Sequence, residues 1–157
     1  MKAIRSTTYW QTLLMETYRV LLCMSTSPAL SWIHSRTRLR VVDNSTVGKQ
    51  AMLSGKPPYL VDVYKKGVMM RKSKRGLLGD KVLVACLGQL RKAYIVGHKT
   101  HVSQTQPLVP RSDTNNIVLL DDNGNPLGTR ILLPIPMALR GKRGDFAKVL
   151  AIATKFV

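Results

Sequence analysis

The stretch "GDKVLVACLGQLRKAYIVGHK", residues 79–99, decides the fold class. Its first part, "GDKVLVACLG" (79–88), carries β-branched and apolar residues at both odd and even positions. This pattern predicts a strand that is buried on both faces or curled into a closed barrel. Only the four residues Gly88 to Arg91 separate it from "KAYIVGHK" (92–99), so the two parts are expected to pair as a hairpin.

Short apolar runs divided by Gly, Pro and Asn continue on both sides of this hairpin, which is typical of an all-β barrel or sandwich. In "RLRVVD" (38–43), for example, Leu39 and Val41 alternate with arginines. The expected strands lie near residues 38–43, 59–66, 80–88, 92–99, 117–121 and 128–133.

The segment "IVLLDDNGNPLGTRI" (117–131) predicts a second chain reversal. Asn123-Gly124 supplies the positive φ angles that a tight turn requires, and Pro126 stops the pairing. After two further prolines the chain becomes basic, and Asp145 is expected to cap a helix running to about residue 153. The inner side of that helix would carry Phe146, Val149, Leu150 and Ala153.

Charge limits the choice of partner. The 157 residues favour one domain, and they contain 25 Lys and Arg against 8 Asp and Glu, a formal net charge of +17. Apolar residues make up 45% of the chain, which is too many for a disordered basic tail. A foldable core under a basic surface favours nucleic acid as the partner, ahead of an anionic membrane or an acidic protein.

Cys23 and Cys86 show no disulfide framework, so a reducing compartment is expected.

Residues 1–35 differ from the rest and predict a mitochondrial presequence. They contain ten Ser or Thr and a single acid, Glu16, and apolar residues recur at helical spacing. A secretory signal is disfavoured because the longest apolar run there, 20–24, is too short. An ordered amphipathic helix that stays in the protein is the remaining alternative. No run is long enough to span a membrane, and the folded domain is expected over 36–157.

This interpretation of the leader gives a direct test. Residues 1–35 fused to a reporter are expected to carry it into mitochondria, because an acid-poor amphipathic segment is the import signal. Fluorescence microscopy with fractionation measures the result, and the reporter fused to residues 36–157 is the control. Cytosolic retention of the first fusion contradicts the interpretation.

Residues that could carry catalysis or bind a metal are sparse. Asp121 and Asp122 are adjacent, so on a strand end they point to opposite faces and cannot act as an acid–base pair. His98 and His101 lack a third ligand at a recognised spacing, and Cys86 is expected to be a small buried hydrophobe. The sequence therefore predicts no enzyme, no metal and no cofactor.

The basic positions are the remaining signal. "YKKGVMMRKSKRG" (64–76) contains six cations and no acid, whereas an ordinary solvated surface mixes both signs. Cations return at Arg91-Lys92, expected at a hairpin tip, and in 140–143 beside two glycines. Aromatic residues are few, so structured RNA bound through its phosphates is favoured over a single-strand stacking surface. The candidate RNA-binding residues are Arg40, Asn44, Ser45, Lys49, Lys65, Lys66, Arg71, Lys72, Lys74, Arg75, Arg91, Lys92, Lys99, Arg111, Arg140, Lys142 and Arg143. For Asn44 and Ser45, a local Asx turn is an equal alternative.

Four segments carry a family resemblance: "RVVDNS" (40–45), "GDKVLVA" (79–85), "NNIVLLDDNGNPLGTRI" (115–131) and "FAKVLAIA" (146–153). In this order and spacing they resemble the universal ribosomal protein L-fourteen family of the large subunit, and with the leader the chain looks like its mitochondrial form. The resemblance implies a five-stranded β-barrel with short C-terminal helices, located in the mitochondrial matrix on the ribosome. It also implies contacts with large-subunit rRNA, with large-subunit proteins three and nineteen, and with small-subunit rRNA at a bridge.

The resemblance further implies that a ribosome-silencing or assembly factor covers Thr129, Arg130 and Lys148. The alternative is that Arg130 pairs with Asp121 or Asp122 across the reversal. Two departures from the family pattern stand out. Ser112 and Thr114 replace an aromatic residue and a glycine, so the loop 100–114 is expected to differ, and Leu77-Leu78 replaces a basic pair.

The main alternative is a free RNA-binding barrel that acts as a translation or RNA-processing factor. An RNA-modifying enzyme comes third, because no set of convergent titratable groups can be assembled from the sequence.

Overall fold

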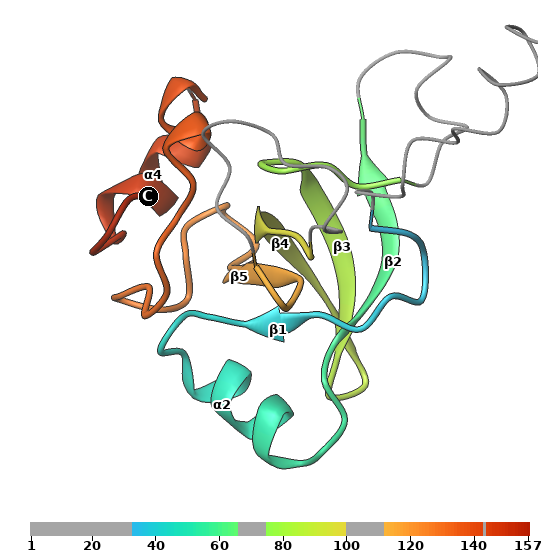
Figure 1. The fold of residues 1–157 in the computed structure, drawn as a ribbon. Helices are drawn as coiled ribbons and strands as arrows, with labels where there is room; N and C mark the ends of the chain where they lie inside the picture. The colour runs from blue at the N-terminus through green and yellow to red at the C-terminus, as the bar shows by residue number, and fades with distance from the viewer. Residues whose placement is uncertain (1–32, 66–74, 100–111, 143) are drawn as a thin grey trace, which may run out of the picture. The chain divides into compact units, whose positions relative to one another are not determined.

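The computed structural model describes residues 33–65, 75–99, 112–142 and 144–157. The prediction of a mainly β fold with five strands and short C-terminal helices is confirmed (Figure 1). In chain order the elements are β1 (Arg40–Val41), α2 (Thr46–Leu53), β2 (Tyr59–Tyr64), β3 (Lys81–Cys86), β4 (Gln89–Gly97), β5 (Asn116–Leu120), η1 (Met137–Gly141) and α4 (Phe146–Ala151).

The five strands form one sheet in the order β1-β5-β4-β3-β2, in which only the β1–β5 pair is parallel. The sheet is not closed, so the closed barrel expected from the sequence is corrected. The residues before β1 nevertheless lie along β2. The Leu39 amide donates to Pro58 O at 2.8 Å, and the Leu60 amide donates to Thr37 O at 3.0 Å. These bonds satisfy part of the backbone at the two edges of the sheet and curl it around its core.

The β3–β4 hairpin is confirmed, but its turn is shorter than expected. Cys86 pairs with Gln89, so the turn consists of Leu87 and Gly88 alone. Leu87 has φ 51° and Gly88 has φ 79°. Two consecutive positive φ angles match the twist of the flanking strands, and a leucine rarely accepts one of them.

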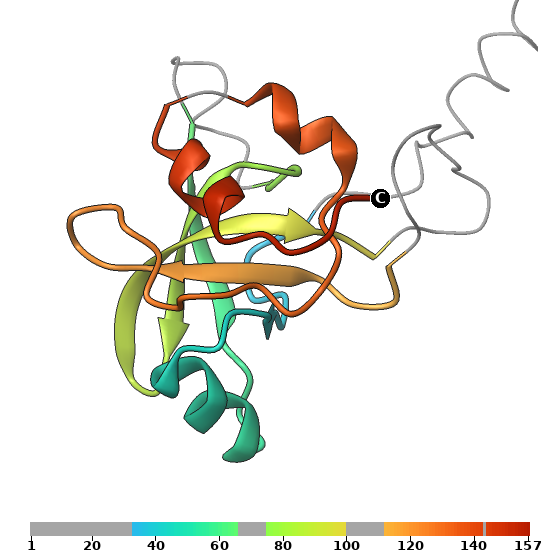
Figure 2. The ribbon, with the colours of Figure 1, turned by 90° about the vertical axis from the view of Figure 1, so that its left-hand side faces the viewer.

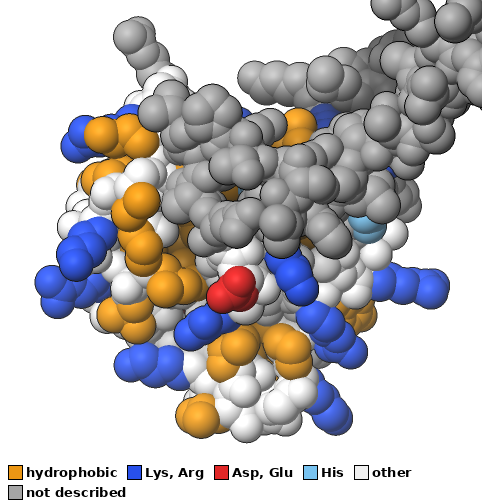
Figure 3. Space-filling view, viewed as in Figure 1, with side chains coloured by type: hydrophobic (Ala, Val, Ile, Leu, Met, Phe, Trp, Pro, Cys, Tyr) orange, Lys and Arg blue, Asp and Glu red, His pale blue; other side chains and the backbone are white. Residues whose placement is uncertain are grey.

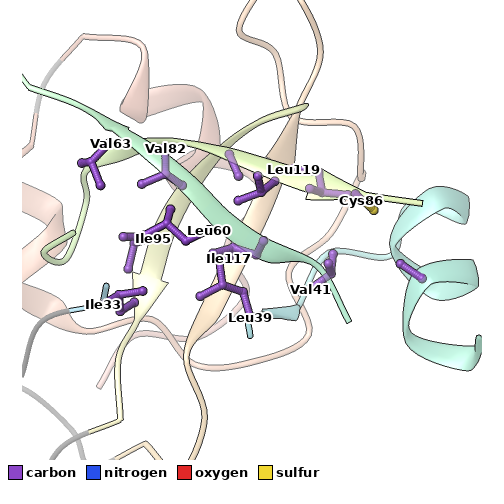
Figure 4. Packing of buried hydrophobic residues seen from close by; sticks show 13 residues of the cluster. Ile33, Leu39, Val41, Leu60, Val63, Val82, Cys86, Ile95, Ile117 and Leu119 are labelled. Carbon is purple, nitrogen blue, oxygen red and sulfur yellow. The ribbon is translucent and has the colours of Figure 1, made fainter. Parts of the chain in front are cut away.

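Burial differs between the strands. In β3 the residues alternate between half-buried and buried, so the expected burial of both its faces is wrong. All five residues of β5 are buried, because β5 packs on both faces. One core cluster joins the strands to Ala51 of α2, and Figure 4 shows side chains such as Ile95, Ile117 and Leu119 pointing toward one another within it.

A second core cluster lies between the other face of β4 and β5 and the C-terminal segment. Figure 2 shows η1 and α4 on this side of the two strands and α2 on the opposite side. Phe146 packs against Tyr94 edge to face, with ring centroids 5.1 Å apart. The prediction that Phe146, Val149, Leu150 and Ala153 face inward is confirmed, since the first and second are buried and the others half-buried.

Helix α2 was not expected from the sequence. Ser45 is its N-cap, and the Ser45 hydroxyl accepts a hydrogen bond from the Gly48 amide at 3.2 Å. A Cβ atom at Gly48 would lie 2.5 Å from Val41 Cγ1, so only glycine lets the helix pack this closely against β1.

The C-terminal part contains two further corrections. The strand expected at 128–133 does not form; instead Ile131 makes single bridges to Asp43 and to Ala153. Helix α4 starts after Asp145 as expected, but the Asp145 side chain makes no capping hydrogen bond. The reversal at Asn123-Gly124 is confirmed, although only Gly124 has a positive φ angle.

Among the described helices, none combines the length and apolar character needed to cross a membrane.

Candidate RNA-binding surface

The candidate cations fall into three groups. Lys66, Arg71, Lys72, Lys74, Arg111 and Arg143 lie outside the described residues. Exposed side chains belong to Arg40, Lys49, Arg75, Lys99, Arg140 and Lys142, and half-buried ones to Lys65, Arg91 and Lys92. On the part of the face in Figure 3 that the described residues form, Lys and Arg surround apolar side chains and acids are scarce.

Two candidate lysines meet at one aspartate. Lys65 follows β2 and Lys142 follows η1, yet their Nζ atoms lie 4.0 and 3.9 Å from the two carboxylate oxygens of Asp80. Both ion pairs join residues that are far apart in the sequence. Together with Lys81, these residues line an open groove of about 880 Å³.

The pair Arg91-Lys92 does not act as a unit. The pair lies within β4 and not at the hairpin tip, where Arg91 is opposite Val84 and Lys92 is opposite Leu83. Because successive side chains of a strand point to opposite faces, the two side chains lie on opposite faces of the sheet. Arg91 donates to Gln89 Oε1 at 2.8 Å, whereas Lys92 donates to Asp122 O at 3.2 Å. The two side chains are therefore presented on different faces of β4.

The Arg140 side chain makes contacts within the protein. Its guanidinium carbon lies 4.5 Å from the centroid of the Phe156 ring, and Nη1 lies 3.8 Å from the Met137 sulfur. The cation–π contact holds Arg140 against the C-terminal segment while its charge remains at the surface.

The polar candidates Asn44 and Ser45 have structural roles. Ser45 is 7% exposed and its hydroxyl makes a local hydrogen bond that caps α2, while its role in RNA binding stays a prediction. Asn44 Oδ1 accepts hydrogen bonds from the backbone amides of Thr129 and Arg130, at 2.8 and 3.2 Å. The Asn44 amide group also donates to the Thr129 hydroxyl at 2.9 Å. Asn44 thus fixes the loop that presents Thr129 and Arg130.

Thr129, Arg130 and Lys148 are all exposed. The Ile131 amide donates to Ile152 O at 3.0 Å, which ties the 129–130 loop to the segment after α4. Lys148, on α4, donates to Asn125 Oδ1 at 2.8 Å. Neither Asp121 nor Asp122 pairs with Arg130 within the described part of the chain, so the alternative of an ion pair across the reversal is not supported.

Asp43 was missed by sequence reasoning, although it lies in the "RVVDNS" segment. It is 4% exposed, and burial outweighs the nearby Ser45 hydroxyl and the backbone of Leu119 and Gly128, which favour the ionised form. Burial raises the pKa of its carboxyl from 3.8 to about 6. A buried carboxyl of this kind destabilises the fold when it is ionised.

The loop expected to differ from the family is described from Ser112 onward. Ser112 Oγ donates to Thr114 O at 2.8 Å and accepts from Asn116 Nδ2 at 3.1 Å, while Thr114 Oγ1 donates to Asn116 Oδ1 at 2.7 Å. The two departures thus build a hydrogen-bond network at the start of β5.

Among the described residues, no three His, Cys, Asp or Glu side chains gather into a possible metal site. His98 is buried, which lowers its pKa, and His101 lies outside the described residues.

The molecule is thus a small, basic, mainly β domain with two packed core clusters and with cations on loops and strand ends. Comparison with known proteins identifies the family to which this domain belongs. The model of the family described as "Ribosomal protein L14p/L23e" matches residues 32–157. A curated relative from Danio rerio, named "Large ribosomal subunit protein uL14m", is 47% identical over 133 residues, which cover 85% of this chain and 86% of the relative. The chain belongs to the ribosomal protein L14p/L23e family, and the resemblance found in the sequence is confirmed.

Proposed function

We propose that this ribosomal protein is a structural constituent of the mitochondrial large ribosomal subunit that binds rRNA at the subunit interface. Family membership and the Danio rerio relative support the ribosomal role. The observation that carries RNA binding is the excess of exposed cations. Arg40, Lys49 and Lys99 make no ion pair within the described part of the chain. Unneutralised cations on a folded domain suit phosphate contacts.

The proposed function also implies which partners the protein contacts. The protein contacts large-subunit rRNA through the basic loops, adjoins large-subunit proteins three and nineteen, and contributes to a bridge with small-subunit rRNA. It acts in the mitochondrial matrix, and the predicted leader and the name of the Danio rerio relative support this location. No catalytic step is assigned to it.

Sedimentation tests this role. Mitochondrial lysate is separated on sucrose gradients after washing at high salt, and the protein is quantified against other large-subunit proteins. A constituent stays with the large subunit at fixed stoichiometry, because its contacts are built in during assembly. Release by salt would instead favour a free translation or RNA-processing factor.

The exposed set Thr129, Arg130 and Lys148 is proposed to dock an acidic silencing or assembly factor. Changing Arg130 and Lys148 together to Glu is expected to abolish factor docking while subunits still assemble, because reversed charges repel an acidic partner. Factor pulldown from mitochondria, alongside subunit sedimentation, measures both outcomes.

The matched control changes Lys56 and Lys155 to Glu. Both are exposed and lie outside every proposed site, and the change in net charge is the same. The control is expected to retain the factor. Retention of the factor by the Arg130 and Lys148 variant, or failure of its large subunit to form, would contradict the assignment.

A further inference from the structure

A groove between the sheet and the C-terminal segment brings together lysines that are distant in sequence. Lys65 comes from the end of β2, Lys81 from the start of β3, and Lys142 from the end of η1. Asp80 and Asp145 are the acids of the lining, so three lysines against two aspartates leave a formal charge of +1. Tyr64, on the rim, is half exposed.

Asp80 connects the three surrounding elements. Its Oδ2 accepts the Leu77 amide at 2.9 Å and lies 4.0 Å from Lys65 Nζ, while its Oδ1 lies 3.9 Å from Lys142 Nζ. The Asp80 side chain is 20% exposed, that of Lys65 14% and that of Lys142 43%. The carboxylate therefore sits between two ammonium groups that would otherwise repel each other across the groove.

The backbone beside Asp80 allows this approach. Gly79 has φ 75°, and a Cβ atom there would lie 2.8 Å from Cδ and Cε of Lys142. The absence of a side chain at Gly79 lets the aliphatic part of Lys142 lie against the main chain. Lys81 is held differently, with Nζ 5.9 Å from the centroid of the Tyr94 ring. Lys65 and Lys142 are thus the two lysines of the lining whose ammonium groups lie within 4.0 Å of the Asp80 carboxylate.

We propose that Asp80 is a positioning residue that holds Lys65 and Lys142 ready to bind one phosphodiester of the rRNA backbone in this groove. The inference rests on the proposed RNA-binding function and names the site that performs part of it. Two ammonium groups fixed by one carboxylate lose less conformational freedom on binding than two free lysines do. Each then contributes a charge-assisted contact to a phosphate oxygen.

The test is whether Asp80→Asn strengthens or weakens the binding of the protein to RNA. If charge alone governed binding, Asp80→Asn would strengthen binding to RNA, because it removes a negative charge. Positioning predicts the opposite: affinity for transcribed mitochondrial large-subunit rRNA falls about threefold to tenfold for the full chain. The slope of log affinity against log salt flattens by about 0.7 to 0.9, the loss of one phosphate contact. Asparagine still accepts the Leu77 amide, so the fold is retained, and circular dichroism checks this.

Asp122→Asn is the matched control. Asp122 is exposed and makes no ion pair within the described residues, so its replacement should leave the affinity unchanged or raise it slightly. Lys142→Gln is a second variant, at a more exposed position, and it is expected to weaken binding by a similar factor. The double variant Asp80→Asn with Lys142→Gln should bind no more weakly than the weaker single variant, because both changes remove the same contact.

The outcomes separate the inference from the function on which it rests. Stronger or unchanged binding by Asp80→Asn, or additive losses in the double variant, overturns the positioning role while RNA binding stands. Failure of the unmodified chain to bind this rRNA in a salt-dependent way overturns both.

Discussion

Replacing Arg71, Lys72, Lys74 and Arg75 together by alanine is expected to weaken binding to large-subunit rRNA by about 10²-fold at physiological salt. Each lost phosphate contact flattens the slope of log affinity against log salt by about 0.7 to 0.9, so four contacts change it by about 3. Incorporation of the protein into the large subunit should fall accordingly. The free energy of unfolding is expected to change by no more than about 0.5 kcal/mol, because the proposal gives these four cations a role in RNA binding and none in the core.

Filter binding across a salt series measures this change, and sedimentation measures incorporation. The matched control exchanges Lys and Arg at the same four positions, which preserves the charge and should preserve the slope. If the alanine variant keeps the slope of the unmodified protein, the cations of residues 64–76 are only solvated charges, and their proposed contact with rRNA is wrong.

Asp43→Asn is expected to stabilise the protein by up to about 3 kcal/mol above pH 7. Burial raises the pKa of Asp43 from 3.8 to about 6, and each pKa unit corresponds to about 1.4 kcal/mol. Because the folded state holds the proton more tightly than the unfolded state, ionisation costs stability as pH rises from about 4 to above 6. The neutral amide of asparagine does not ionise, so the variant escapes this loss.

Urea unfolding at several pH values measures the effect. The free energy difference between Asp43→Asn and the unmodified protein should be largest above pH 7 and should shrink as pH falls toward 4. Asp62→Asn, which replaces an exposed acid of β2, is the control variant and is measured in the same way. A difference for Asp43→Asn that stays constant with pH would show that the carboxyl titrates normally.

The sheet was predictable where local pattern and tertiary packing agree. The β3–β4 hairpin was found because β-branched residues and a short connection both favour it. Its turn was missed because Leu87, which occupies a positive φ angle, extends the apolar pattern of the strand. Helix α2 was missed because Gly48, its third residue, has a low helix propensity, about 1 kcal/mol less favourable than alanine inside a helix. Close packing against Val41 selects that glycine, and a single sequence does not show such a contact.

The candidate surface was predictable as a set of charges but not as an arrangement. Sequence identifies cations such as Arg91 and Lys92, yet strand geometry sends the two side chains to opposite faces. For Asn44 and Ser45 the sequence predicts RNA contacts or an Asx turn, whereas their partners are Thr129, 85 residues away, and the helix after Ser45. The role of Asp80 is not visible in the sequence, because it depends on two lysines that are brought to this residue from separate parts of the chain.

The pairing of β1 with β5 has a consequence for folding kinetics. Val41 pairs with Ile117, and the described strands β2, β3 and β4 lie between these two residues in the chain. During synthesis, β1 has no strand partner until residue 116 has been made. Contacts of such long sequence separation must first overcome loop-closure entropy, so folding is expected in milliseconds to seconds rather than microseconds. The β2–β3–β4 meander can form early. We expect the β1–β5 pairing and the hydrogen bonds between Asn44 and Thr129 to form last.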